Sequence, residues 1–270
     1  MEALAWGTGV SASLVFAFRR LASVGLAAIF LAAFAGGEIA RAKTLTDHKP
    51  HDGVARAHVM PIQGIDVSYW QGDIDWERTR ASGVRFAFIK ATEGGDHLDP
   101  KFLDNWYGAK RAGIAHGAYH FIYWCRPADE QALWFMLNVP ADPDALPPVL
   151  DLEWNSHSKT CPDRVARDVA LKKIRIMLDA MQTHTGKRPI IYTDPVFHRQ
   201  VLEGEFPEYH FWLRSVAAEP DEIYQQRNWA FWQFTQTGSV PGVDGKVDRN
   251  SFNGTDGDWE RVLNWLNASR

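Results

Sequence analysis

Short apolar runs alternate with stretches of helical period along most of the chain, and this alternation limits the folds that are open to it. In one such unit the apolar run Val84-Arg85-Phe86-Ala87-Phe88-Ile89-Lys90 is followed by a helical stretch at about 100–112, which ends at Gly113. Apolar runs that are nearly continuous are typical of strands buried on both faces of a parallel sheet. Five strand-helix units followed by several further strands predict an α/β fold, either a parallel barrel or a wound sheet.

Polar side chains recur at one end of the expected strands. The strands are expected at 64–68, 84–90, 114–121, 149–153, 189–192, 210–214, 229–234 and 243–250, and the helices at 75–82, 100–112, 128–138, 163–185, 195–202 and 259–266. In a parallel barrel the functional residues gather at the carboxyl ends of the strands. The residues at or near such ends are Asp66, Glu93, His120, Asp151, Glu153, Tyr192 and Gln233. Because scattered surface residues would not keep this phase, the pattern predicts a site at that end.

Two of these residues stand close together in the apolar strand that begins after Pro147-Pro148. Side chains alternate between the faces of a strand, so Asp151 and Glu153 point to one face and Leu152 to the other. Two acids on one face of an apolar strand are costly unless they are used. Their backbones are expected about 6.5–7 Å apart, from which two carboxyl groups can converge on one sugar ring. The alternative is a strand-end aspartate that caps the next helix and an unrelated surface glutamate.

Other chemistries find less support in the sequence. A net charge of −4 without a basic stripe argues against a nucleic-acid partner. His116 and His120 share a strand face but are expected about 13 Å apart along it, and no His-Glu-x-x-His helix or EF-hand loop is present. There is no Gly-x-Ser-x-Gly elbow and no phosphate-binding loop. We therefore expect neither a metal nor another cofactor.

Residues 1–42 have the character of a targeting segment. Arg19-Arg20 precede an apolar run at 21–35, and small residues follow it. This pattern predicts an export signal, and the alternative is an uncleaved membrane anchor, in which only residues 21–36 would contact the membrane. Either way the body of the protein is expected outside the cytoplasm, secreted or periplasmic. Residues 43–61 are polar and aperiodic, and we expect them to be a linker to a domain at 62–270.

The chain contains two cysteines, and each follows an expected strand by a few residues. In an oxidising compartment Cys125 and Cys161 are expected to form a disulfide, which would stabilise the fold by roughly 3–4 kcal/mol. Two unrelated free thiols are the alternative.

Several short motifs, taken together, are specific to one family. The set resembles the glycoside hydrolase family 25 muramidases, lysozymes that cut bacterial peptidoglycan, and the resemblance covers about 62–266. The motifs are Gly64-Ile65-Asp66-Val67-Ser68 with Gln71, Phe88-Ile89-Lys90-Ala91-Thr92-Glu93-Gly94, Gly117-Ala118-Tyr119-His120-Phe121, Asp151-Leu152-Glu153, Trp232-Gln233-Phe234-Thr235 and Val247-Asp248-Arg249-Asn250-Ser251-Phe252.

The resemblance implies both a fold and an activity. The fold would be an irregular TIM-like barrel with eight strands and about five helices. The activity would be hydrolysis of the β-1,4 bond between N-acetylmuramic acid and N-acetylglucosamine, with Glu153 as the general acid and Asp66 and Asp248 as further active-site carboxylates. Asp151 would be the second acid of the pair, and its role as nucleophile, as stabiliser or as helper of an acetamido-assisted route stays open.

The resemblance also implies how substrate is bound. Tyr119, Tyr192 and Gln233 would line the cleft. We add Glu93 and Trp154, which lie at or beside strand ends, and Trp212 to the expected substrate-binding residues. The expected partner is the glycan strand of peptidoglycan, and the protein is expected to be a monomer.

Two other functions remain open from the sequence. One is a catalytically silent glycan-binding protein of the cell envelope, against which the presence of all four family carboxylates argues. The other is a glycosidase of the same mechanism that acts on a chitin-like polymer.

Overall fold

The computed structural model describes residue 49 and residues 51–225 and 227–268, so the expected targeting segment at 1–42 lies outside the described residues. Its strands form a closed eight-stranded barrel, which confirms the predicted fold class. No helix in the described ranges is long and apolar enough to cross a membrane. The barrel strands are β1 (Gln63–Val67), β2 (Val84–Glu93), β4 (Ala115–Phe121), β5 (Val149–Leu152), β6 (Ile190–Thr193), β7 (Phe211–Arg214), β8 (Trp229–Gly238) and β9 (Val247–Phe252).

One strand of the barrel runs against the others. The pairs from β1 through β2 and β4 to β8 are parallel, whereas β9 is antiparallel to both of its neighbours, β8 and β1. The β1–β2 pairing closes the ring. The two-residue strand β3 (His97–Leu98) pairs only with the end of β2 and forms a hairpin outside the ring. The first residues of β9 therefore lie at the same end of the barrel as the last residues of β1.

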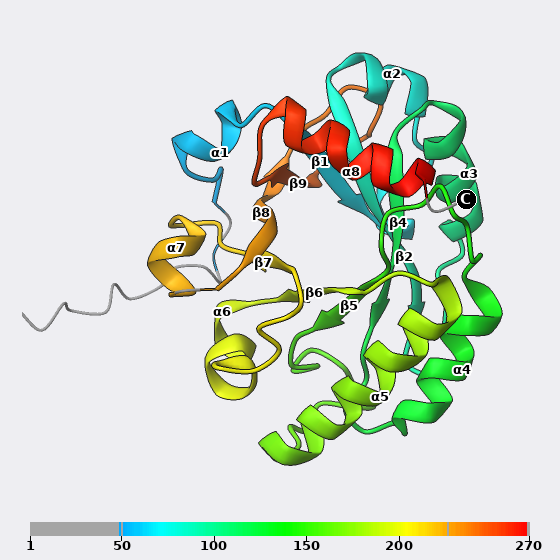
Figure 1. Cartoon of the computed structure of the whole chain (residues 1–270), viewed down its shortest axis with the longest axis vertical. Helices are drawn as coiled ribbons and strands as arrows, with labels where there is room; N and C mark the ends of the chain where they lie inside the picture. The colour runs from blue at the N-terminus through cyan, green and yellow to red at the C-terminus, as the bar shows by residue number, and fades with distance from the viewer. Residues whose placement is uncertain (1–48, 50, 226, 269–270) are drawn as a thin grey trace, which may run out of the picture. The chain divides into compact units, whose positions relative to one another are not determined.

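The helices cover the outside of the barrel unevenly (Figure 1). Within the described residues five helical runs exceed six residues, as the resemblance implied: α3 (Phe102–Arg111), α4 (Ala128–Asn138), α5 (Arg167–Thr185), α8 (Asp256–Ala268) and the continuous run from α6 (Pro195–Phe197) through the π-helical turn His198–Leu202. The shorter helices are α1 (Ala55–Val59), α2 (Trp76–Ala81) and α7 (Pro220–Ile223). Helices α3, α4 and α5 flank one side, with α6 and α7 on the other.

Strand alternation divides the apolar residues into two cores. The outward residues of the strands, such as Ile89 and Leu150, pack under the helices, and the inward residues, such as Phe88 and Trp212, fill the barrel. Gly64 makes room for this filling, because a Cβ there would lie 2.4 Å from the ring of Phe86. This apolar filling occupies the half of the barrel in which the parallel strands begin.

Helix α8 closes that apolar end. Its Trp259 is only 1% exposed and packs against Phe86 at the start of β2 and Phe252 at the end of β9, with ring centroids 5.6 Å and 5.2 Å away. The carboxyl ends of the parallel strands are therefore the end at which polar groups can gather.

The segment expected to be a linker packs on the barrel. The hydroxyl of Thr235 donates to the carbonyl of His51 at 2.6 Å, and the ring of His58 lies edge-on to Phe234 at 4.9 Å. Ala57 of α1 is fully buried. The outer face of β8 has no following helix to cover it, since β8 leads directly to β9, and this upstream segment supplies the cover. The folded part thus begins by His51 rather than at residue 62.

Replacing the closing tryptophan tests this arrangement. Trp259→Ala should lower the free energy of unfolding by about 3–5 kcal/mol, because it empties a closed apolar space. Urea unfolding measures the change. Trp70→Ala is the matched control, because it deletes the same atoms from a side chain that is 76% exposed, and it should change stability by about 0.5 kcal/mol or less. Equal losses in the two variants would contradict the assigned role of α8.

Candidate active site

Two aspartates meet at the open end because β9 is reversed. Asp66 is the last residue but one of β1, and Asp248 is the second residue of β9. The antiparallel register makes them direct partners across the two strands. On the other side of β9, Asn250 is the register partner of Gln233 on β8. Three neighbouring strands therefore bring two acids and two amides together.

The two amides hold the two acids in a fixed arrangement. The Nε2 of Gln233 donates to Oδ2 of Asp66 at 2.9 Å and to Oδ2 of Asp248 at 3.1 Å, and Nδ2 of Asn250 donates to Oδ2 of Asp66 at 2.7 Å. The indole Nε1 of Trp212 donates to Oδ1 of Asn250 at 2.8 Å. An indole N–H can only donate, so it fixes which end of the Asn250 amide faces the acid.

Burial changes the charge of this aspartate pair. It raises the pKa of Asp66 to about 6, against the opposing effect of hydrogen bonds from Asn250 and Gln233. It raises the pKa of Asp248 to about 9, and the neighbouring charge of Asp66 adds to the rise. Two carboxyl groups that interact this closely titrate as a pair. Near neutral pH the pair therefore retains a proton.

Asp151 lies on the opposite side of the barrel mouth. Three strands separate β5 from β9 in both directions around the ring. Asp151 is 8% exposed, and burial raises its pKa well above the ordinary value, with the charge of Glu153 as the next contribution. Its Oδ1 has no hydrogen-bond partner within the described part of the chain. A buried polar atom of this kind is rare unless it has a function or binds a group that is absent.

Glu153 completes the cluster of four carboxyl groups. It follows the last residue of β5 by one position and is half-buried. Its charge raises the pKa of Asp151, Tyr192 and Asp248, which places the Glu153 side chain at the same mouth. The structure therefore brings together all four acids that the sequence singled out.

The predicted cleft tyrosines lie within this cluster. The hydroxyl of Tyr192 donates to Oε1 of Gln233 at 2.8 Å. Burial, and then the nearby acids, raise the pKa of both Tyr119 and Tyr192 well above the ordinary value. Both phenols stay protonated at any physiological pH and can donate hydrogen bonds.

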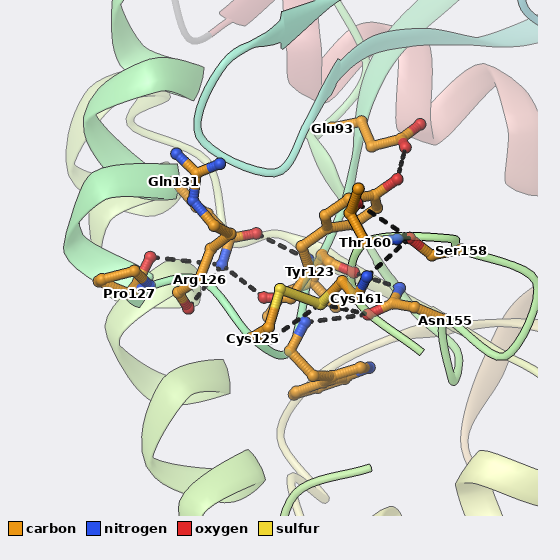
Figure 2. Close-up of a disulfide and its surroundings, with 12 residues drawn as sticks. Glu93, Tyr123, Cys125, Arg126, Pro127, Gln131, Asn155, Ser158, Thr160 and Cys161 are labelled. Atoms are coloured by element: carbon orange, nitrogen blue, oxygen red, sulfur yellow. Dashed lines mark hydrogen bonds between the residues drawn. A yellow bond between two sulfur atoms is a disulfide. The ribbon is translucent and has the colours of Figure 1, made fainter. Parts of the chain in front are cut away.

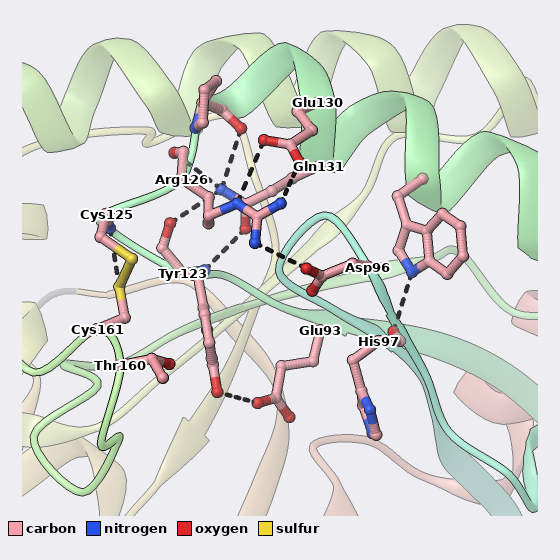
Figure 3. A network of polar contacts seen from close by, with 12 residues as sticks. Glu93, Asp96, His97, Tyr123, Cys125, Arg126, Glu130, Gln131, Thr160 and Cys161 are labelled. Carbon is pink, nitrogen blue, oxygen red and sulfur yellow. Dashed lines mark hydrogen bonds and ion pairs between the residues drawn. A yellow bond between two sulfur atoms is a disulfide. The ribbon is translucent and has the colours of Figure 1, made fainter.

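Glu93 belongs to a polar wall beside the mouth (Figure 3). It forms an ion pair with Lys90 and accepts a hydrogen bond from the hydroxyl of Tyr123. Burial would raise its pKa, but Lys90 and Tyr123 outweigh that effect and lower it. Arg126 joins the neighbouring Asp96 to α4 by contacts to Asp96 and Glu130. Glu93 is thus ionised, and ion pairs and hydrogen bonds hold the residues around it in place.

The two predicted tryptophans take different places. Trp212 is 2% exposed and lies beneath the mouth, stacked on Phe88 at 4.6 Å, so it supports the site from below through Asn250 and through its ring contact with Tyr192 at 4.5 Å. Trp154 points to the outside of the barrel, where it packs against Phe197 at 4.8 Å and donates to Oε1 of Gln200 at 2.7 Å. Trp154 lies two residues beyond the last residue of β5.

Four residues at the mouth were not expected from the sequence. Arg214 ends β7, and its charge opposes the rise in the pKa of Asp248. Asn250 shares a strand face with Asp248, a spacing that could have indicated it. Lys90 stands in the second motif beside Glu93. Trp70 is exposed on the loop after β1, three residues beyond the strand end.

The expected disulfide joins two loops at this end of the barrel (Figure 2). It links Cys125, after β4, to Cys161, after β5, and these are the two cysteines of the chain. Within the described ranges no group of three or more His, Cys, Asp or Glu side chains is arranged to hold a metal ion. The chemistry present at the carboxyl end of the barrel is that of carboxyl groups, amides and phenols, which suits acid-base cleavage of a sugar polymer.

Comparison with known proteins agrees with this chemistry. The model of the family described as "Glycosyl hydrolases family 25" matches residues 65–243. The chain is 38% identical over 205 residues to the uncharacterized protein YegX of Escherichia coli K12 (72% of this chain and 70% of that protein). It is 34% identical over 217 residues to lysozyme M1 of Streptomyces globisporus (75% and 71%).

Solved structures give the same result. A family 25 glycosyl hydrolase from Bacillus anthracis superposes with a TM-score of 0.70 at 35% identity, covering 79% of this chain and 97% of that chain. The bacterial lysozyme from Streptomyces coelicolor superposes with a TM-score of 0.67 at 34% identity, covering 78% and 100%. The family match ends at residue 243, so the place of Asp248 in the site rests on the geometry.

The retained protons predict how stability changes with pH. In the unfolded chain an aspartate loses its proton near pH 4, whereas folded Asp66 and Asp248 hold theirs to about pH 6 and 9. The folded state binds more protons between these values, so the free energy of unfolding should fall as pH rises from 4 to 9, by at most about 1.4 kcal/mol per pH unit for each proton.

Asp248→Asn tests this effect. In this variant the free energy of unfolding should decrease less between pH 4 and pH 9. At pH 8 the variant should be more stable than the wild type in urea unfolding. Asp163→Asn, at an exposed position, is the control and should keep the wild-type slope. Parallel profiles for wild type and Asp248→Asn would contradict the buried pair.

Proposed function

The chain belongs to glycosyl hydrolase family 25, and from that membership we propose an exported muramidase that uses Glu153 as its general acid. The bond cleaved is the β-1,4 bond between N-acetylmuramic acid and N-acetylglucosamine of peptidoglycan. The observation that carries this proposal is the arrangement of the four carboxyl groups, with Asp151 and Glu153 facing Asp66 and Asp248 across one open mouth.

Glu153 suits the task of protonating the glycosidic oxygen. A general acid has to reach the leaving oxygen from the edge of the cleft, and Glu153 is the one of the four acids that lies beyond its strand. Burial, and then the charge of Glu153, raise the pKa of Asp151, so ionising both neighbouring carboxyl groups at once is unfavourable. In this proposal Glu153 carries the proton that the leaving oxygen takes up as its bond to the anomeric carbon breaks.

Asp151 fits a role beside the reacting carbon. Its buried Oδ1 has no hydrogen-bond partner in the described part of the chain and is placed to accept a hydrogen bond from substrate. The acetamido N–H of the sugar is a suitable donor, and holding it would direct the acetamido oxygen toward the anomeric carbon. Of the three roles left open for Asp151, we therefore propose this helper role.

The Asp66–Asp248 pair would act on the substrate as a half-neutralised surface, since one of its two carboxyl groups keeps a proton near neutral pH. With one proton retained, it presents both a donor and an acceptor to sugar hydroxyls, and Tyr119 and Tyr192 add donors. Such a lining binds polar, uncharged groups without strong repulsion. Glycan strands of peptidoglycan supply groups of this kind.

Action outside the cytoplasm completes the proposal. The Cys125–Cys161 disulfide persists in oxidising compartments, and the substrate of lysozymes lies in the wall. We propose a secreted or periplasmic enzyme that acts as a monomer and needs no cofactor.

The acid assignment predicts the effect of one substitution. Glu153→Gln should lower kcat by about 10²–10⁴-fold, because the amide cannot donate the proton. Release of reducing ends from purified peptidoglycan measures this. Glu77→Gln, at an exposed position of α2, should keep wild-type activity. Undiminished turnover in Glu153→Gln would remove Glu153 from the acid role.

The bond assignment predicts the products. Borohydride reduction of the digest, followed by mass analysis, should find the new reducing ends on N-acetylmuramic acid. Ends on N-acetylglucosamine would indicate the opposite linkage. Equal cleavage of a chitin-like polymer, which has no lactyl ether, would indicate a broader glycosidase.

A further inference from the structure

Glu153 lies just outside the part of the chain that the sheet holds in place. The last pairings of β5 are Asp151 with Phe121 of β4 and Leu152 with Thr193 of β6. A catalytic group has to be held within about 0.5 Å of its working position. The strand pairing of β5 ends at Leu152, one residue before Glu153, so it does not fix the position of Glu153. Contacts from the loops have to supply the rest.

Trp124, on the loop after β4, contacts the backbone of Glu153 directly. Its indole Nε1 donates to the carbonyl oxygen of Glu153 at 2.6 Å. The side chain is 1% exposed and stacks on Phe197 at 5.0 Å, with 19° between the ring planes. The carbonyl of Trp124 accepts from Nζ of Lys173 on α5 at 2.9 Å. The donor to Glu153 is therefore itself rigidly held.

Asn155 ties the chain on the other side of Glu153 to the same loop. It is 3% exposed, and its Oδ1 accepts from the backbone N–H of Trp124 at 2.9 Å. Its Nδ2 donates to the carbonyl of Ile122 at 2.8 Å, and its own carbonyl accepts from the N–H of Ser158 at 2.8 Å. Two buried side chains thus join residues 153 and 155 to residues 122–124.

The disulfide closes this connection covalently (Figure 2). Cys125 follows Trp124 directly, and Cys161 lies at the far end of the loop that carries Asn155. The N–H of Cys125 also donates to Sγ of Cys161 at 2.9 Å, and the N–H of Cys161 donates to Oγ of Ser158 at 3.1 Å. No helix or strand lies between residues 153 and 161, so the backbone of this loop is not held by regular secondary structure. The disulfide joins the loop covalently to the loop after β4.

Resting on the proposed acid role of Glu153, we propose that Trp124, Asn155 and the Cys125–Cys161 disulfide form a clamp that positions Glu153 and makes catalysis depend on the redox state of the enzyme. Trp124 and Asn155 are positioning residues, since they contact the backbone around Glu153. A dithiol reductant converts the disulfide to two thiols and is itself oxidised to a disulfide. The clamp then loses its covalent restraint, Glu153 becomes mobile, and kcat falls. The enzyme is weakly active in a reducing compartment and gains full activity when it is oxidised.

The first test compares the oxidised and the reduced full-length chain on soluble peptidoglycan fragments. Reduction, confirmed by thiol titration, should lower kcat about 10-fold or more, leave KM within about two-fold, and be reversed by reoxidation. Cys125→Ser/Cys161→Ser should match the reduced enzyme and not respond to reductant. Assays run well below the melting temperature of each form, with circular dichroism confirming the fold, separate mobility of Glu153 from unfolding. An unchanged kcat in the fully reduced enzyme would overturn the proposal.

A pair of tryptophan variants tests the positioning contact itself. Trp124→Phe keeps an aromatic ring but deletes the donor to Glu153. It should lower kcat about 10-fold with KM little changed, and it should shift the alkaline limb of the pH–rate profile, which a general acid sets. Trp134→Phe deletes an indole donor to the carbonyl of His97, which lies outside the proposed clamp, and should leave kcat unchanged. Equal effects in the two variants would refute positioning by Trp124. Full activity in Glu153→Gln would instead refute the acid role, so the two failures are distinguishable.

Discussion

The burial of several carboxyl groups at one end of a closed barrel is the constraint on which the rest of the structure depends. An isolated buried carboxylate is very costly, so each acid needs a proton, an amide donor or a cation nearby. Gln233 and Asn250 supply donors to Asp66, the Asp66–Asp248 pair retains a proton, and Lys90 and Arg214 supply positive charge. The protonation state of the site follows from these compensations, because the Asp66–Asp248 pair keeps a proton near neutral pH.

The apolar packing at the opposite end of the barrel offsets the unfavourable free energy of burying these carboxyl groups. Phenylalanine and tryptophan side chains fill the amino-terminal half, and α8 seals it with Trp259. Trp212 connects the two halves, since its ring stacks on Phe88 below while its indole N–H orients Asn250 above. One side chain therefore belongs both to the packed core and to the support of the site.

The sequence predicted the polar residues at the strand ends better than it predicted the long-range contacts that hold those residues in place. Period and apolar runs placed Asp66, Asp151, Glu153 and Gln233 at one end of the barrel, because side-chain direction in a strand is a local property. The pairing of Asp66 with Asp248 depends on the reversed direction of β9, which no local pattern encodes. Trp154 was expected at the substrate, but it lies beyond the end of β5 and packs on Phe197 outside the barrel. Residues 51–61 were expected to be a linker because their contact with β8 is long-range.

The pairing of β1 with β9 has a consequence for when the enzyme can act. Asp66 and its partner Asp248 are 182 residues apart in the chain, so the ribosome makes almost the entire fold before the ring can close. Contacts this distant in sequence form late and slowly in folding. A nascent chain carries Glu153 and Asp151 long before it carries the strand that faces them across the mouth. The four carboxyl groups therefore come together only after almost the whole chain has been made, and in a chain exported before β9 docks they would meet only at its destination.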